Sequence, residues 1–111
     1  MNTQPQTGRK LKMAELAVIT ALAPSVRASL EDALVVEMLD GGMGSIRFLS
    51  GSDRRRSRSI AGAEYVDDDA VLVSIELNVD EKEELFERDF WKVDFSPLRR
   101  YPNPEDLKLL K

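Results

Sequence analysis

The chain has 111 residues, no cysteine, no histidine and a formal net charge of −4. These absences exclude disulfides, cysteine- or histidine-bound metal sites, and catalysis by Ser–His or Cys–His pairs. A content of 42% hydrophobic and 32% charged residues is typical of one ordered globular domain. No apolar run approaches the roughly 20 residues that cross a bilayer. We therefore expect a cytoplasmic protein without membrane association, with a flexible tail over residues 1–8 and a single domain over residues 9–111.

The first predicted elements are two helices. An apolar stripe with helical period predicts a helix that begins between Arg9 and Met13. This helix ends before Pro24, whose ring disfavours a helical residue ahead of it. Pro24 itself suits the first turn of a helix, so a second, shorter helix is expected to end near Asp32.

A hairpin is expected next, with strands over residues 34–39 and 46–49 around the turn Asp40-Gly-Gly-Met-Gly-Ser45. Glycine tolerates positive φ, so an Asp–Gly pair between two apolar runs predicts a turn. The segment lacks the lysine and the following helix of a phosphate-binding loop. Met43 at its tip has an adaptable side chain of the kind found at binding surfaces, and packing is the alternative.

Residues 50–59 are expected to form a polar loop that contains Arg54-Arg-Arg-Ser-Arg58. Clustered guanidinium groups bind phosphates, so this run is the best candidate in the chain for contact with nucleic acid. No aromatic residue is interleaved with the arginines, so base stacking has no support. A solvated loop is the preferred interpretation, with contact to an acidic partner as the alternative.

Two strands are predicted over residues 60–66 and 70–77, separated by a turn at Asp67-Asp-Asp69. In the second strand the side chains alternate strictly, which predicts that one face is buried. The buried face is expected to contain Val71, Val73, Ile75 and Leu77.

The segment after the loop at residues 78–84 is predicted to be the central strand of the domain, ending before Pro97. Large apolar side chains occur at both odd- and even-numbered positions along it. Since successive side chains point to opposite faces, the strand is expected to bury side chains on both faces or to change face at a bulge. The odd set is Leu85, Trp91, Val93 and Phe95, and the even set is Phe86 and Phe90. Near the C-terminus, Asn103 and Pro104 have the signature of a short helix start.

These elements predict an α+β fold in which two N-terminal helices pack on a roughly five-stranded antiparallel meander sheet, followed by a short C-terminal helix. The helices cover one face of the sheet, and the other face stays partly open. Phe86 and Phe90 would need a cover if they were on the open face.

Charge is divided unevenly along the chain. Residues up to Arg58 include 9 basic and 6 acidic side chains, whereas residues from Ser59 onward include 7 basic and 14 acidic ones. The acidic half repels phosphate, which argues against nucleic acid, and it attracts a protein partner with a basic surface. We therefore predict a non-enzymatic protein-binding module of the immunity-protein or adaptor type. Its predicted contact residues are Met43, Asp80, Glu87, Asp89, Phe90, Trp91 and Asp94.

Two other hypotheses remain open. A magnesium-assisted, carboxylate-dependent hydrolase would require Asp67, Asp69, Asp80 and Asp94 to cluster around one pocket. The acidic spacing matches no calcium loop, and no nucleophile is recognisable nearby, so no catalytic, metal or cofactor residue is predicted. In the third hypothesis, a homo-oligomeric structural protein, the open sheet face pairs with a second copy.

Two segments carry a resemblance to a known family: Asp40-Gly-Gly-Met-Gly-Ser-Ile-Arg-Phe48 and Phe90-Trp-Lys-Val-Asp-Phe-Ser-Pro-Leu98. Together they resemble a family of small bacterial proteins of unknown function, with a DGGMGS-type hairpin and a WKVDFSPL-type final strand. One departure is Lys82-Glu83-Glu84, where the family pattern implies a glycine-containing turn. The resemblance implies no activity, so it assigns no functional residue. Small proteins of this composition include immunity proteins that block secreted toxins, an analogy of size and composition.

Overall fold

The computed structural model describes residues 8–49 and 55–110. In chain order its elements are β1 (Arg9–Lys10), α1 (Met13–Leu22), η1 (Pro24–Leu30), β2 (Leu34–Glu37), β3 (Ile46–Phe48), β4 (Arg56–Val66), β5 (Leu72–Asp80), β6 (Leu85–Lys92), η2 (Pro104–Asp106) and β7 (Lys108–Leu110). The predicted tail over residues 1–8 is outside the described residues except for Gly8.

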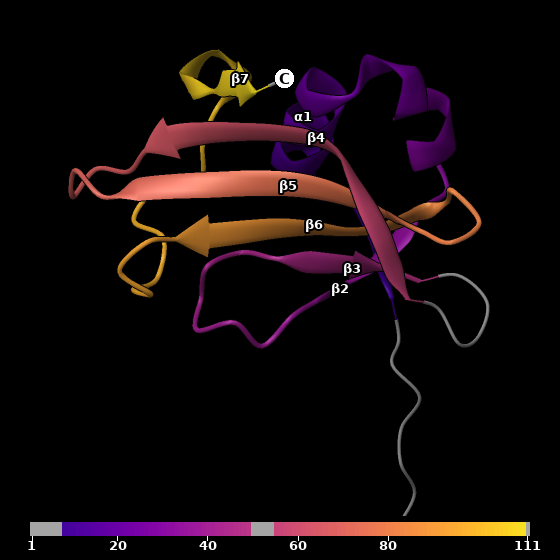
Figure 1. Ribbon diagram of the computed structural model, residues 1–111, viewed down its shortest axis with the longest axis horizontal. Coiled ribbons are helices and arrows are strands. Elements are labelled where there is room, and N and C mark those ends of the chain that lie inside the picture. Colours follow the sequence, from indigo (N-terminus) through magenta and orange to yellow (C-terminus); the bar gives the residue numbers. More distant parts are fainter. Residues whose placement is uncertain (1–7, 50–54, 111) are drawn as a thin grey trace, which may run out of the picture.

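The strands form one seven-stranded sheet in the order β1-β2-β3-β6-β5-β4-β7, and all neighbouring strands are antiparallel (Figure 1). The expected five-stranded meander is therefore wrong in strand number and in strand order. The meander β4–β5–β6 is joined to the β2–β3 hairpin through β6, which pairs with β3. Strand β4 is therefore the member of the meander farthest from the hairpin. Two short strands, β1 and β7, then extend the sheet at its edges.

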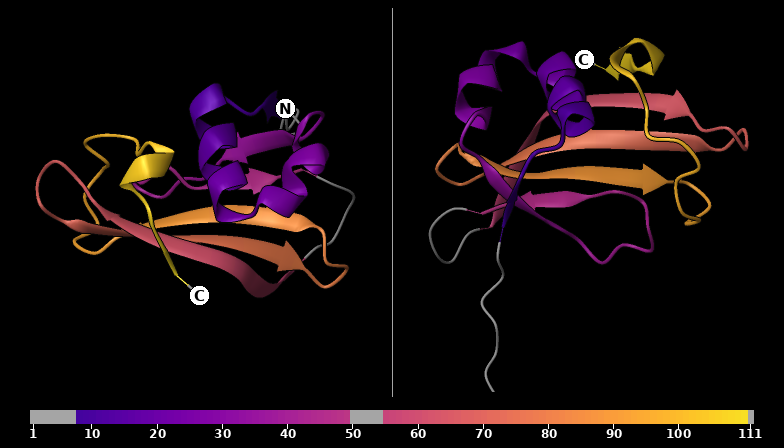
Figure 2. Two further views of the ribbon diagram at one scale, coloured as in Figure 1. Left: turned by 90° about the horizontal axis from the view of Figure 1, so that it is seen from above. Right: turned by 180° about the vertical axis from the view of Figure 1, so that it is seen from behind.

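The expected pair of N-terminal helices is also wrong, because α1 is the only α-helix in residues 8–49 and 55–110. The segment η1, Pro24–Leu30, is a 3₁₀ helix. At the C-terminus the helix start at Asn103 gives a single 3₁₀ turn, η2, and the chain then continues into strand β7. Figure 2 shows α1, η1 and η2 on the same face of the sheet. We call this the covered face and the opposite one the open face.

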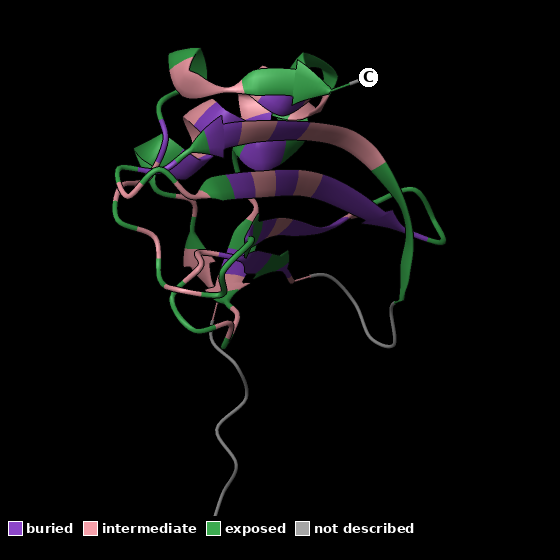
Figure 3. Cartoon of the chain, turned by 60° about the vertical axis from the view of Figure 1, so that its left-hand side comes forward, coloured by how far each residue is buried: buried purple, intermediate pink, exposed green. Residues whose placement is uncertain are grey.

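The core lies between α1 and the covered face, where the central strands contribute alternate side chains (Figure 3). The predicted alternation in β5 is confirmed for Val73, Ile75 and Leu77, which are fully buried. From α1, Val18 and Ile19 pack against them without any exposed surface. Burial of these branched side chains is the main favourable term in folding.

The sequence left two alternatives for β6, burial of large side chains on both faces or a change of face at a bulge. The pairing with β5 has a register shift between Asn78 and Val79, which pair with Glu87 and Leu85, so the irregularity lies at Phe86. Phe86 is buried, but it lies outside the core cluster, with the Arg47 guanidinium over its ring.

Phe90 is buried in the core on the covered face, whereas Trp91 on the open face is 50% exposed. The strand ends at Lys92, well before Pro97. Burial on the open face varies along β6, because Glu87 and its partner Asn78 are buried, whereas Trp91 near the end of the strand is half exposed.

The glycine-rich segment connects β2 to β3 as predicted, but it is a longer loop that leans on the C-terminal segment. Gly42 and Gly44 have φ values of 83° and 97°, and an added Cβ would lie 3.1 Å from Pro97 and 3.2 Å from Leu98. The Leu98 amide donates a hydrogen bond to the Gly42 carbonyl at 3.1 Å. Glycine is therefore required for both backbone conformation and close packing.

The prediction of a polar loop over residues 50–59 is wrong for its C-terminal part. Arg56–Ser59 belongs to β4, and residues 50–54 are outside the described residues. Two of the arginines are paired with acidic side chains, Arg56 with Glu76 and Arg58 with Glu83.

Candidate functional site

The open face at the end of the sheet where β6 terminates is the first candidate site. Directly paired residues of neighbouring antiparallel strands share a face. Trp91 pairs with Ser74, which pairs with Glu64, and in the next row Asp89 pairs with Glu76. These residues therefore form a continuous surface across β6, β5 and β4.

Five large apolar side chains gather at this corner. Val66 and Leu72 are paired across β4 and β5, and the Val93 amide donates to the Leu72 carbonyl. We call the group the aromatic patch: Val66, Leu72, Trp91, Val93 and Phe95. They make up half of the exposed large hydrophobic side chains in the described residues. Contiguous exposed apolar surface of this kind marks interaction sites in folded proteins.

The two aromatic rings of the patch contact each other and remain accessible. Trp91 is 50% exposed and Phe95 is 62% exposed, and their ring centroids are 5.1 Å apart in a T-shaped arrangement. Edge-to-face packing is a favoured geometry for two aromatic rings. The pair therefore forms one aromatic surface that remains accessible to solvent.

Phe95 has an uncommon backbone conformation, with a φ of 63°. Positive φ brings Cβ close to a carbonyl oxygen and costs a bulky residue roughly 1–2 kcal/mol. Hydrogen bonds hold this turn: the Phe95 amide donates to the Lys92 carbonyl, and the Asp94 carboxylate accepts from the Ser96 amide and hydroxyl. These hydrogen bonds lower the pKa of Asp94. Strained backbone of this kind concentrates at functional sites.

Carboxylates surround the patch, and we call them the acidic rim: Glu64, Glu76, Asp89 and Asp94. Glu76 lies 3.7 Å from the Arg56 guanidinium, with both side chains about half exposed. Asp89 accepts a hydrogen bond from the Ser45 hydroxyl at 2.9 Å. In residues 8–49 and 55–110, Glu64, Asp89 and Asp94 have no ion pair. The rim therefore has negative charge that the rest of the described chain leaves unbalanced.

A buried ion-pair network lies beneath this corner, on the covered face. The Lys92 ammonium, which is fully buried, is 2.9 Å from Asp67 and 2.6 Å from Asp69, and it donates to the Pro97 carbonyl at 3.0 Å. Asp67 also accepts from the backbone amides of Arg99 and Arg100. The network ties the β4–β5 turn to the segment that follows Phe95.

Both charges of this pair are stabilised in their ionised forms. Burial by itself raises the pKa of Asp67, but the Arg99 amide and the Lys92 ammonium outweigh it and lower that pKa to about 2. Burial lowers the pKa of Lys92, but the carboxylates of Asp69 and Asp67 outweigh it and raise that pKa. The network is therefore a structural anchor with satisfied charges.

The same network bears on the magnesium hypothesis. The Lys92 ammonium group lies between Asp67 and Asp69. It therefore occupies the position that a magnesium ion would need. Asp80 is at the opposite end of β5, where it accepts hydrogen bonds from the amides of Lys82 and Glu84. Within the described residues no group of three or more acidic side chains is placed to hold a metal ion. The clustering that a hydrolase would require is thus not formed there.

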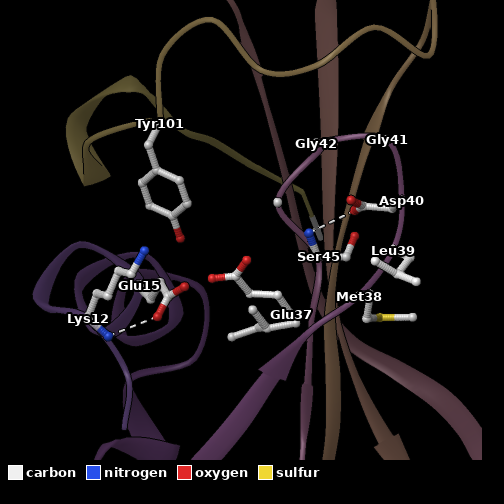
Figure 4. Close-up of a pocket in the computed structure, with 12 residues that line it drawn as sticks. Lys12, Glu15, Glu37, Met38, Leu39, Asp40, Gly41, Gly42, Ser45 and Tyr101 are labelled. Carbon is white, nitrogen blue, oxygen red and sulfur yellow. Dashed lines mark hydrogen bonds between the residues drawn. The ribbon is translucent and has the colours of Figure 1, made fainter. Parts of the chain in front are cut away.

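The second candidate site is a pocket of about 610 Å³ beside the glycine-rich loop (Figure 4). The carboxylates of Glu15 and Glu37 and the hydroxyl of Tyr101 point toward its centre. Glu15 is bound by both Arg9 guanidinium nitrogens and by the Lys12 amide, each at 2.8 Å.

The other polar groups near this pocket also have partners. Asp40 accepts from the amides of Met43 and Ser45, and Tyr101 accepts from Arg88. The Arg88 guanidinium also donates to the Gly44 carbonyl and lies over the Phe90 ring. Burial raises the pKa of Tyr101 to about 12. The carboxylates beside the pocket are bound by groups of the chain itself, although the buried Nε of Arg88 has no hydrogen-bond partner among the described residues. We place the functional site on the open face, where the carboxylates around Trp91 are at least partly exposed.

The structure places the sequence-predicted contact residues in three different environments. Trp91 and Asp89 lie on the open face at the aromatic patch, and Asp94 is in the turn that follows, where its carboxylate accepts from Ser96. Glu87 is buried on the open face between Arg47 and Asn78. The others contribute to packing or turns: Met43, whose sulfur contacts the Lys92 amide; Asp80, 2% exposed; and Phe90, 1% exposed and stacked on Tyr101.

Several residues of the surface were not predicted from the sequence. Phe95 and Val93 are at odd-numbered positions, as Trp91 is. The sequence pattern of the central strand had therefore already grouped them with Trp91. Val66 and Leu72 flank the aspartate turn, so that turn brings them together. Glu64 and Glu76 join the rim only through the register of β4, β5 and β6.

The fold and site define a single-sheet antiparallel domain with one face covered by helices and an exposed aromatic patch on the other. The chain belongs to a family described as a domain of unknown function (DUF6984), whose model matches residues 8–102. No curated protein and no solved structure matches this chain. The family match agrees with the expected membership in a family without an assigned activity. Among the described residues, no helix is both long and apolar enough to cross a membrane.

Proposed function

We propose that this protein is a non-enzymatic binding module that recognises another protein through the aromatic patch and its acidic rim. The observation that carries the proposal is the Trp91–Phe95 pair, which is exposed on the open face and surrounded by carboxylates. Tryptophan is the residue type most enriched among those that dominate binding energy at protein interfaces. A rigid ring pair also loses little conformational entropy when a partner binds.

Strain at Phe95 supports the same proposal. A residue with positive φ that is 62% exposed gains little burial in return for its backbone cost. Glycine would occupy this position at lower cost. A contact with a partner gives the phenyl ring a role that folding alone does not.

The charge of the surface favours a partner with a basic rim. Glu64, Asp89 and Asp94 attract positive charge and repel phosphate, so a basic protein fits better than nucleic acid. Self-pairing of two open faces would bring acidic rims together at a cost in repulsion. A heterologous partner therefore fits better than a second copy of this chain.

The test is direct binding by a purified partner. The protein is used as bait, the captured protein is identified and purified, and its affinity is measured by isothermal titration calorimetry. We expect Trp91→Ala to weaken binding by at least about tenfold, as is typical of a central aromatic contact. The matched control is Met13→Ala, because Met13 is 88% exposed on α1, away from the open face.

Each variant is first shown to be folded by circular dichroism and thermal unfolding. Equal affinity of Trp91→Ala and the original protein would refute the proposed surface, as would equal losses in Trp91→Ala and Met13→Ala. Analytical ultracentrifugation tests the homo-oligomer hypothesis separately. A mass that rises with concentration, and that Trp91→Ala returns to the monomer value, would support self-pairing in place of a heterologous partner.

A further inference from the structure

We propose that the partner anchors on this surface through an arginine side chain, which stacks on the Trp91–Phe95 pair and forms ion pairs with Asp89 and Glu76. This inference rests on the proposed function and specifies the chemistry of its partner. It follows from the placement of two aromatic rings and two carboxylates within one small area of the open face.

The rings provide the platform for a cation. Trp91 and Phe95 meet at 5.1 Å with an interplanar angle of 65°, so the two rings form a corner, and each residue is at least half exposed. The electron-rich face of tryptophan attracts cations more strongly than that of any other side chain. The same chain already stacks guanidinium groups on rings, since Arg47 lies 4.9 Å from the Phe86 ring centroid.

The carboxylates lie in the adjacent row. Asp89 precedes Trp91 by two residues on β6 and so shares its face, and Glu76 is the cross-strand partner of Asp89. Directly opposed side chains have Cβ atoms about 5 Å apart. One guanidinium group can therefore contact both carboxylates while its stem remains over the indole.

Both carboxylates have capacity for this contact. Only one oxygen of Asp89 is used, by the Ser45 hydroxyl, and no described residue bonds to the other. Glu76 is 3.7 Å from the Arg56 guanidinium, a loose contact that leaves Glu76 about half exposed. The contact with Arg56 also shows that a guanidinium group can reach Glu76 from the open face.

A hollow on the far side of Ser74 from Trp91 gives room for a long side chain. It has a volume of about 350 Å³, and its lining includes Gly62, Ser74, Glu76 and Leu110. Ser74, the cross-strand partner of Trp91, has a small side chain, so the surface is low directly beside the indole. In the next row Leu110 lies against Gly62. The aliphatic stem of an arginine fits over Ser74, with Trp91 on one side and the hollow on the other.

Arginine fits these features better than lysine. Its guanidinium group is planar, so it stacks on an aromatic face and presents several donors to carboxylates at once. The ammonium group of lysine is more strongly hydrated and does not stack. A surface with an open ring pair and two adjacent carboxylates is therefore complementary to a guanidinium group.

The single tryptophan of the chain makes the test direct. In a ¹H–¹⁵N correlation spectrum the indole N–H of Trp91 gives its own signal. The intact protein is titrated with a blocked glycine–arginine–glycine tripeptide, and with matched peptides that have citrulline or lysine in place of arginine. We expect a saturable shift of the indole signal with the arginine peptide in the millimolar range, and a much weaker response to the other two.

Asp89→Asn combined with Glu76→Gln is expected to weaken the arginine peptide about threefold to tenfold, because two exposed ion pairs are lost. Asparagine retains the acceptor that Ser45 uses. The matched control is Glu31→Gln combined with Glu105→Gln, which removes two charges from exposed positions in or beside the η1 and η2 segments of the covered face. This control is expected to bind like the original protein.

Four results would overturn the inference: no saturable shift, equal binding of citrulline, equal or tighter binding of lysine, or equal weakening of both double variants. None of these would affect the proposed function, which depends on partner binding and its loss in Trp91→Ala. A partner bound through Trp91 but insensitive to the arginine peptide would refute the arginine anchor alone.

Discussion

The two faces of strand β6 differ in how far their charged and aromatic side chains are buried and paired. On the covered face, Lys92 is fully buried, and the carboxylates of Asp67 and Asp69 lie 2.9 Å and 2.6 Å from its ammonium group. On the open face, the next residue, Trp91, is half exposed beside a carboxylate that has no ion pair in the described residues. The difference shows that the charges around Lys92 have a structural role, whereas exposure and unbalanced charge identify the candidate site around Trp91.

The same comparison explains why the pocket beside the glycine-rich loop is the weaker candidate. Its carboxylates Glu15 and Asp40 are bound by groups of the chain itself. A ligand there would have to replace contacts that already satisfy these side chains, at a cost in desolvated polar groups. The acidic rim requires no such replacement at Asp89.

The largest expected effect comes from two neighbouring aromatic residues on opposite faces. Phe90→Ala is expected to lower the free energy of unfolding by about 3–5 kcal/mol, because it leaves a cavity in the core. Trp91→Ala is expected to lower it by only about 1–2 kcal/mol, because the indole is half exposed. Chemical denaturation monitored by far-ultraviolet circular dichroism measures both. Equal losses would contradict the division of β6 into a structural and a functional face.

Lys92→Met is expected to lower the free energy of unfolding by about 3–5 kcal/mol, because it leaves buried carboxylate charge without its cation. The double variant Lys92→Met with Asp67→Asn is expected to recover part of that loss, since the uncompensated charge at Asp67 is also removed. Denaturant titrations of the two variants give the comparison. A double variant less stable than the single one would mean that Asp67 acts mainly through its backbone hydrogen bonds.

The pH dependence of stability distinguishes the faces further. The pKa of folded Asp67 is about 2, below its ordinary value of 3.8, so ionised Asp67 stabilises the folded state above about pH 4. This contribution is lost as the pH falls from about 4 to about 2. The stability difference between the original protein and Asp67→Asn should therefore shrink over that range, as measured by thermal unfolding. A difference that stays constant would show that the charge of Asp67 contributes nothing.

The smallest expected effect concerns the backbone at Phe95. Phe95→Gly is expected to be more stable than Phe95→Ala by about 1 kcal/mol, because only glycine relieves the positive φ. Both variants lack the ring, so both are expected to bind the partner weakly. Thermal unfolding and calorimetry on this pair separate strain from contact. Normal partner binding by Phe95→Gly would remove the ring from the proposed surface.

Parts of the fold and of the site were predictable from the sequence for identifiable reasons. In β5, Val73, Ile75 and Leu77 alternate with less apolar neighbours, which indicates one buried face without ambiguity. In β6, bulky residues occur at both parities, so the pattern cannot tell which set is buried. Trp91 and Asp89 were named from their proximity in sequence, whereas Glu64 and Glu76 reach the site through strand register alone.

The sequence by itself determined the turns and the alternation of the central strands, because glycine conformation and side-chain period are local properties. It also determined the excess of acidic residues after Arg58. Only the tertiary structure decided which face of β6 is covered, how far the sheet extends and which cation neutralises the aspartate turn. These outcomes depend on pairing between segments distant in sequence, and local pattern carries no information on which segments will meet.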